Sequence, residues 1–128
     1  MKYLLDTCTF IWQVADPAKL SATALQITQD PKNDFALSII SSWEIVLLTS
    51  IGKFVFKQPV DVVIPDQRRL LAINLLPLTE TAVFYLPKLP PLHRDPFDRM
   101  LVCQAILDDL TILTPDPLIQ QYPVKTAW

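Results

Sequence analysis

Four short apolar segments alternate with helical segments along this chain, and the alternation restricts the possible folds more than any other feature of the sequence. The apolar segments comprise residues 2–5, 35–39, 73–76 and 110–113, and residues 124–126 allow a fifth. Strands that are apolar on both sides are typical of a parallel sheet with helices on both faces. We therefore expect an α/β fold with a mostly parallel central sheet.

The helical segments have recognisable starts and stops. Ser21 is a suitable N-cap, and Asp95 and Pro96 suit the N-cap and the first turn of the last helix. Because proline breaks the interior of a helix, we place a helix start at Pro65 rather than before it. The expected helices comprise residues 10–14, 22–29, 41–48, 65–71, 80–86 and 96–107.

The length of 128 residues fits one domain, residues 1–128, that is large enough to bury a core. Apolar residues make up 51% of the chain, but charges or prolines interrupt every apolar run before membrane-spanning length. The apolar run after Met1 is too short for a signal peptide, so we expect a cytoplasmic protein without a membrane segment. Cys8 and Cys103 fit no metal-ligand spacing and are expected to be free thiols.

Two further features exclude common classes of nucleotide-binding protein. The single glycine, Gly52, rules out a glycine-rich phosphate loop and a dinucleotide-binding fingerprint, since both need several glycines. The formal charge of −2 argues against a broad basic surface for nucleic acid. A phosphate-containing substrate would therefore need local cations or a metal ion.

Several carboxylates lie close in sequence to the carboxyl ends of the predicted strands. In parallel sheets, ligands bind outside the carboxyl ends of the strands, and the acids are expected to meet there. Each also has a structural explanation, because Asp95 can cap a helix and Ser41-x-x-Glu44 matches a capping box. Caps alone do not readily explain five acids at one edge: Asp6, Glu44, Asp95, Asp98 and Asp116.

Clustered carboxylates repel one another, and two of them about 4 Å apart cost about 4 kcal/mol at an effective dielectric constant near 20. A divalent cation removes this cost. Hard oxygen ligands with no histidine or cysteine partners favour Mg²⁺ or Mn²⁺ over zinc. Such ions support displacement at phosphorus, so the residues indicate metal-dependent hydrolysis of a phosphodiester.

The motifs Leu-Leu-Asp6-Thr7, Ser-x-x-Glu44, His-Arg-Asp95-Pro-Phe-Asp98-Arg and Leu-Thr-Pro-Asp116 resemble those of the PIN-domain family, and most of all its VapC-type toxin ribonucleases. The resemblance spans essentially the whole chain. It implies a three-layer α/β/α sandwich and RNA cleavage that depends on Mg²⁺ or Mn²⁺. It also implies a homodimer and a cognate antitoxin as partner.

By motif position, the resemblance assigns the acidic site to Asp6, Glu44, Asp98 and Asp116, with Asp95 as a further member. Thr7 and Thr114 correspond to polar positions that orient water or carboxylates. Separately from the resemblance, we expect His93 at the rim, and Arg99 beside the acids either binds phosphate or forms a surface ion pair. Cys8 and Pro115 depart from the usual pattern without removing a ligand. The expected role of Trp12 and Trp43 is core packing, with a partner groove as the second choice.

Two other functions fit part of the pattern. A small phosphatase with an aspartyl nucleophile at Asp6 would want a second acid two residues later, where the chain has Cys8. A non-catalytic interaction domain with an acidic pocket would want a lysine near the acids on a late strand, and the segment from Thr114 to Asp116 has none.

Overall fold

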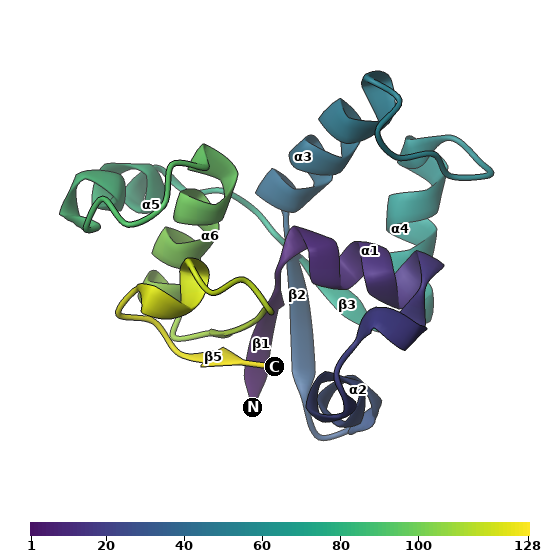
Figure 1. Ribbon diagram of the computed structural model, residues 1–128, viewed down its shortest axis with the longest axis horizontal. Coiled ribbons are helices and arrows are strands. Elements are labelled where there is room, and N and C mark those ends of the chain that lie inside the picture. Colours follow the sequence, from purple (N-terminus) through teal and green to yellow (C-terminus); the bar gives the residue numbers. More distant parts are fainter.

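The central sheet has five strands, all parallel, in the order β3-β2-β1-β4-β5. The computed structural model describes residues 1–128, and Figure 1 shows the sheet nearly edge-on between two groups of helices. This arrangement confirms the predicted α/β fold. The strands are β1 (Lys2–Leu5), β2 (Asp34–Ser38), β3 (Ile73–Leu76), β4 (Thr111–Leu113) and β5 (Thr126–Ala127).

Helices cover both faces of the sheet, with α1, α2 and α4 on one side and α5 and α6 on the other (Figure 1). Three short 3-10 turns, η1 (Pro17–Lys19), η2 (Leu86–Lys88) and η3 (Ile119–Gln121), complete the connections. None of the helices has the length and apolar character of a membrane span. The helices are α1 (Thr7–Ala15), α2 (Ala22–Gln29), α3 (Ile39–Ser50), α4 (Val60–Leu70), α5 (Glu80–Tyr85) and α6 (Pro96–Leu107).

Alternating side chains of β1 enter two separate hydrophobic cores. Tyr3 and Leu5 belong to the core under α1, α2 and α4, and Leu4 belongs to the core under α6. Successive side chains of a strand point to opposite faces of the sheet, so a continuous apolar strand fills both cores at once. This double burial holds β1 firmly at the centre of the sheet.

The order of the strands creates a switch point between β1 and β4. From β1 the chain first proceeds to one side of the sheet through β2 and β3, and later returns to add β4 on the other side. Connections leave β1 and β4 in opposite directions there, which opens a crevice at the carboxyl ends of these two strands. Asp6 follows β1 at this crevice, and its backbone N–H donates to the carbonyl of Leu113 at 3.2 Å.

The structure corrects the predicted start of α3. This helix begins at Ile39, and its N-cap is Ser38, whose hydroxyl accepts a hydrogen bond from the N–H of Ile40. Ser41 and Glu44 therefore lie inside the helix, and the capping box proposed for them is wrong. Ser38 and Ser41 are both suitable N-cap residues, and the local sequence did not distinguish between them.

The structure also corrects the start of α4, which begins at Val60 and continues through Pro65. The prediction placed the start at Pro65 because a proline in the interior removes a helical hydrogen bond. Ile64 is buried against the first core, and this packing stabilises the helix around the proline. Three strands differ from the predicted ranges only at their ends. β2 ends at Ser38 rather than at residue 39, β4 begins at Thr111 rather than at residue 110, and β5 is Thr126–Ala127 rather than 124–126.

Candidate active site

A cavity of about 200 Å³ lies at the switch point between β1 and β4. Four acids come to it from four different parts of the chain: from the end of β1, from α3, from the first turn of α6 and from the segment after β4. The sequence placed these acids at one edge of the sheet, and the structure brings them into one cavity. Its lining consists of Asp6, Thr7, Cys8, Ile11, Glu44, Leu48, Asp98 and Asp116.

Asp6 is buried at the floor of this cavity. It is the N-cap of α1, where one carboxylate oxygen accepts from the N–H of Thr7 at 2.7 Å. The other oxygen accepts from the hydroxyl of Thr114 at 2.6 Å and from the thiol of Cys8 at 3.5 Å. Thr114 is fully buried at the end of β4. Asp6 is thus fixed by groups from both strands that form the crevice.

Glu44 extends into the cavity from α3. One of its carboxylate oxygens, Oε1, is buried and has no hydrogen-bond partner. One turn earlier in α3, the hydroxyl of Ser41 accepts from the hydroxyl of Thr7 at 2.9 Å and ties this helix to α1. Burying a carboxylate oxygen without a hydrogen-bond donor costs free energy of folding. The protein itself therefore leaves Oε1 of Glu44 without a partner in this cavity.

The start of α6 supplies both acids of the pair that the sequence singled out. Asp95 is the N-cap, and one of its oxygens accepts from the N–H groups of Phe97 and Asp98 at 2.9 and 3.4 Å. Asp98 is buried and lines the cavity. Asp95 does not line the cavity, because its carboxylate serves the helix. The predicted cap geometry is confirmed, and only one member of the pair enters the site.

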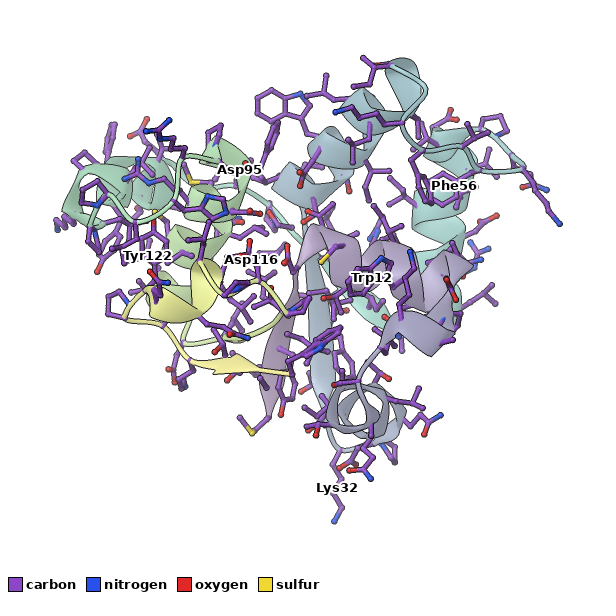
Figure 2. All side chains as sticks on the ribbon, viewed as in Figure 1. Trp12, Lys32, Phe56, Asp95, Asp116 and Tyr122 are labelled. Carbon is purple, nitrogen blue, oxygen red and sulfur yellow. The ribbon has the colours of Figure 1, made fainter.

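Asp116 is positioned by the turn that follows β4. Its backbone N–H donates to the hydroxyl of Thr114 at 3.0 Å, and its Oδ1 accepts from the N–H of Leu118 at 2.9 Å. Its Oδ2 lies 3.2 Å from Nε2 of His93, and Oδ2 of Asp98 lies 2.9 Å from the same nitrogen. The sole histidine therefore joins the two carboxylates at the rim of the cavity. Figure 2 labels Asp95 and Asp116 near the centre of the view, between α6 and α1.

Burial and mutual repulsion make the acids of the cavity hard to ionise. Burial, together with the negative charges of Asp6, Asp95, Glu44 and Asp116, raises the pKa of Asp98 to about 8. Burial raises the pKa of Asp6 although hydrogen bonds from Thr114, Thr7 and Cys8 oppose this shift. Burial also raises the pKa of Glu44. Near neutral pH the site thus carries acids that would ionise fully only beside a cation.

The side chains present fit a hard divalent cation. No lysine or arginine forms an ion pair with any of the four cavity acids, and one oxygen of Glu44 lacks a donor. Carboxylate oxygens are the ligands that Mg²⁺ and Mn²⁺ prefer. The thiol of Cys8 is the one soft group in the cavity, and burial beside Asp6 raises its pKa, so it remains protonated.

Neither Arg99, predicted as a supporting residue, nor Trp43, predicted as a core residue, lines the cavity formed by the acids. Arg99 forms no contact with them, and its Nε is buried without a partner. Trp43 is 56% exposed and meets Phe97 edge-on with ring centroids 4.9 Å apart, so the predicted core role is wrong for this residue. The sequence analysis missed Ser41 as a partner of Thr7 and Tyr122 as a partner of His93. A sequence carries no local signal for such distant pairings.

Three solved structures share this fold over nearly the whole chain. VapBC2 from Rickettsia felis, bound to a DNA fragment from its promoter, gives a TM-score of 0.70 at 16% identity, with 99% of this chain and 98% of that chain covered. VapBC-1 from nontypeable Haemophilus influenzae gives a TM-score of 0.66 at 18% identity, with 99% of this chain and 97% of that chain covered. FitAB bound to an IR36 DNA fragment gives a TM-score of 0.60 at 17% identity, with 98% of this chain and 93% of that chain covered.

No curated protein matches the sequence. The model of the PIN domain family matches residues 3–125, which run from β1 to the segment before β5. The matched range contains all five acids that the sequence analysis selected. The chain therefore belongs to the PIN-domain family.

Proposed function

We propose that this PIN-domain protein is an endoribonuclease that hydrolyses RNA phosphodiester bonds with Mg²⁺ or Mn²⁺, and that it is the toxin of a toxin–antitoxin pair. One observation carries the proposal: Asp6, Glu44, Asp98 and Asp116 line a single cavity in which one oxygen of Glu44 has no donor. PIN-domain proteins are nucleases. The structures that share the fold are VapBC and FitAB complexes, and this supports the assignment to a toxin.

In this proposal the four cavity acids hold the metal, which when bound would neutralise their charge and favour attack by water at phosphorus. Asp6 supplies a rigid ligand because Thr114 and the N–H of Thr7 hold its two oxygens. Asp98 and Asp116 supply two further carboxylates that line the cavity. Glu44 carries the donor-free oxygen, so it is the acid most available to orient a water molecule or complete the ligand set.

The proposed substrate is single-stranded or looped RNA, because an unpaired strand exposes its phosphates and bases to a shallow site. The cavity of about 200 Å³ is too small to enclose a nucleotide together with its neighbours. A strand must therefore lie across the cavity rather than enter it. The proposal places the scissile phosphate at the cavity and the flanking nucleotides on the surrounding surface.

The experiment is a cleavage assay with purified, antitoxin-free protein. A labelled RNA containing both stems and loops, a DNA of the same sequence and a small phosphomonoester are each incubated with Mg²⁺, with Mn²⁺ and with a chelator. We expect cuts in unpaired RNA with either metal and none in the chelator. Hydrolysis of the phosphomonoester without RNA cleavage would instead support an aspartate-based phosphatase. No reaction on any substrate, with metal binding demonstrated, would support a non-catalytic acidic pocket.

The proposed partners are a cognate antitoxin and a second copy of the chain. Helix α3 has a row of exposed apolar side chains, Ile39, Trp43, Val46, Leu47 and Ile51. Residues spaced by three and four positions lie on one side of a helix, so these side chains form an apolar surface larger than isolated exposed residues would. This surface supports the homodimer, and the likeness to VapBC and FitAB complexes supports the antitoxin.

A further inference from the structure

The side chain of His93 is held from two directions before it reaches the acids. Its backbone N–H donates to the hydroxyl of Tyr122 at 2.9 Å, and Tyr122 is buried in the second core. Its ring nitrogen Nδ1 accepts from the backbone N–H of Asp95 at 3.2 Å. Figure 2 labels the contacting residues Asp95, Asp116 and Tyr122. The ring therefore has one fixed orientation relative to α6 and η3.

These contacts determine which ring nitrogen carries the proton. Because Nδ1 accepts from an amide N–H, its lone pair is already used. The proton of the neutral ring must then be on Nε2, the nitrogen that lies 2.9 Å from Oδ2 of Asp98 and 3.2 Å from Oδ2 of Asp116. His93 thus presents one N–H, which donates to Oδ2 of Asp116 at 3.2 Å. Oδ2 of Asp98 lies 2.9 Å from the same nitrogen, at ion-pair distance.

The same three residues have the spacing of a metal site, since Nε2 and one oxygen from each acid lie within 4.8 Å of one another. Ligation by Nε2 would require its lone pair and would move the proton to Nδ1. There it would face the N–H of Asp95, and two donors would oppose each other. Histidines that bind metals normally donate their second N–H to an acceptor instead. The surroundings of this ring therefore oppose ligation.

We propose that His93 is a positioning residue whose Nε2–H donates to Asp116 and lies against Asp98 both without and with the metal, and is not itself a ligand. This inference rests on the metal site of the proposed function. Asp98 comes from α6 and Asp116 from the segment after β4, so the N–H that Asp116 accepts lies between two elements whose carboxylates would otherwise repel. The metal then meets ligands that are already oriented, and its ligand set consists of oxygen atoms only.

The chain contains one histidine, so a single set of nitrogen signals reports on it. The test is the ¹⁵N spectrum of histidine-labelled protein, recorded first with a chelator and then with saturating Mg²⁺. Calorimetry on the same sample verifies that Mg²⁺ is bound. We expect a pyridine-type signal for Nδ1 and a pyrrole-type signal with an attached proton for Nε2 in both states. A proton on Nδ1 in either state would overturn the proposal.

Two variants provide a second test through Mn²⁺ affinity, measured by calorimetry. His93→Gln keeps an N–H donor at the site, whereas His93→Ala removes it. We expect the alanine variant to bind Mn²⁺ more weakly, on the order of tenfold, and the glutamine variant to recover most of this loss. The exposed neighbour Arg94 provides a control, and Arg94→Gln should bind as the parent does.

An equal and large loss in both histidine variants would show direct ligation and contradict the proposal. If His93→Ala does not fold, the glutamine variant and the nitrogen spectrum still distinguish a positioning role of His93 from direct ligation. Neither measurement uses RNA. Absence of RNA cleavage together with the expected spectrum and affinities would therefore reject the proposed function and leave the role of His93 standing.

Discussion

For Glu44, the structure distinguishes between a role in capping a helix and a role in the acidic cavity. Its match to a capping box offered a complete structural explanation, but Ser38 is the cap of α3 and Glu44 lies inside the helix. Its oxygen Oε1 is buried in the cavity without a donor. A buried carboxylate oxygen without a donor costs folding energy, and the proposed metal site would account for that cost.

We predict that Glu44→Gln retains the fold and loses activity. The substitution keeps the side-chain volume and removes one negative charge from an acidic cavity, so melting in a chelator should occur at the same or a higher temperature. RNA cleavage with saturating Mn²⁺ should fall on the order of 100-fold, and Mn²⁺ affinity should fall with it. Cleavage at the parent rate would exclude Glu44 from the site and leave the three aspartates to hold the metal.

Asp98 predicts a pH dependence of stability in the absence of metal. Burial and neighbouring negative charges raise its pKa to about 8 in the folded state, against 3.8 for an aspartate exposed to water. The folded state then binds the proton more tightly than the unfolded chain. This contribution to stability is complete below about pH 4 and is lost as the pH rises toward about 8. Raised pKa values at Asp6 and Glu44 act in the same direction.

The measurement is thermal melting in a chelator between about pH 5 and pH 8. The parent should melt at lower temperature as the pH rises, and Asp98→Asn should show a smaller decrease because its side chain cannot ionise. Near pH 8 the variant should be more stable than the parent, and each 1 kcal/mol corresponds to about 3–5 °C in a chain of this length. Identical slopes for parent and variant would show that Asp98 is already ionised in the folded protein.

Among the helices, α6 and α4 show when local sequence is sufficient to place an element and when it is not. Asp95 and Pro96 are direct neighbours in sequence, and together they determine the first turn of α6, so this start was predicted to the residue. The start of α4 depends on burial of Ile64 by strands and helices distant in sequence. A proline rule that considers only the local backbone cannot include this packing energy.

We predict that Pro65→Ala stabilises the protein. Alanine restores a helical N–H and removes the clash of the proline ring, while the unfolded chain gains some entropy, so the net gain should be about 1–2 kcal/mol. Melting should shift upward by about 4–8 °C. Pro59→Ala is the matched control, because Pro59 is the N-cap of α4 and needs no N–H. A lower melting temperature for Pro65→Ala would mean that the helix begins at the proline.

At the scale of the whole molecule, the site exists only because distant segments meet at the switch point. Asp6 and Thr114 are 108 positions apart in sequence, yet their side chains share a hydrogen bond of 2.6 Å. The pattern of strands and acids was enough to predict which edge of the sheet bears the acidic cavity. Which acids enter the cavity, and the contact between Thr7 and Ser41, depend on side-chain packing that the sequence does not display.

The exposed apolar side chains of α3 predict the assembly. Ile51 is 64% exposed and Trp43 is 56% exposed, and burying these side chains against a second copy would stabilise a dimer. Light scattering at micromolar concentration should give twice the 14.6 kDa of one chain. Trp43→Ser should weaken the dimer, while Phe84→Ser, an equally apolar and exposed change on α5, should not. A single-chain mass for the parent would contradict the homodimer.

The measurement that tests the central claim most directly is the location of Mn²⁺ in crystals by anomalous scattering. If the four cavity acids form one metal site, the anomalous signal should lie inside the cavity, among the carboxylate oxygens of Asp6, Asp98 and Asp116 and beside the donor-free oxygen of Glu44. Asp6→Asn, soaked in the same way, should show a weaker signal or none. A strong signal elsewhere on the protein with this cavity empty, or a signal that Asp6→Asn leaves unchanged, would contradict the account.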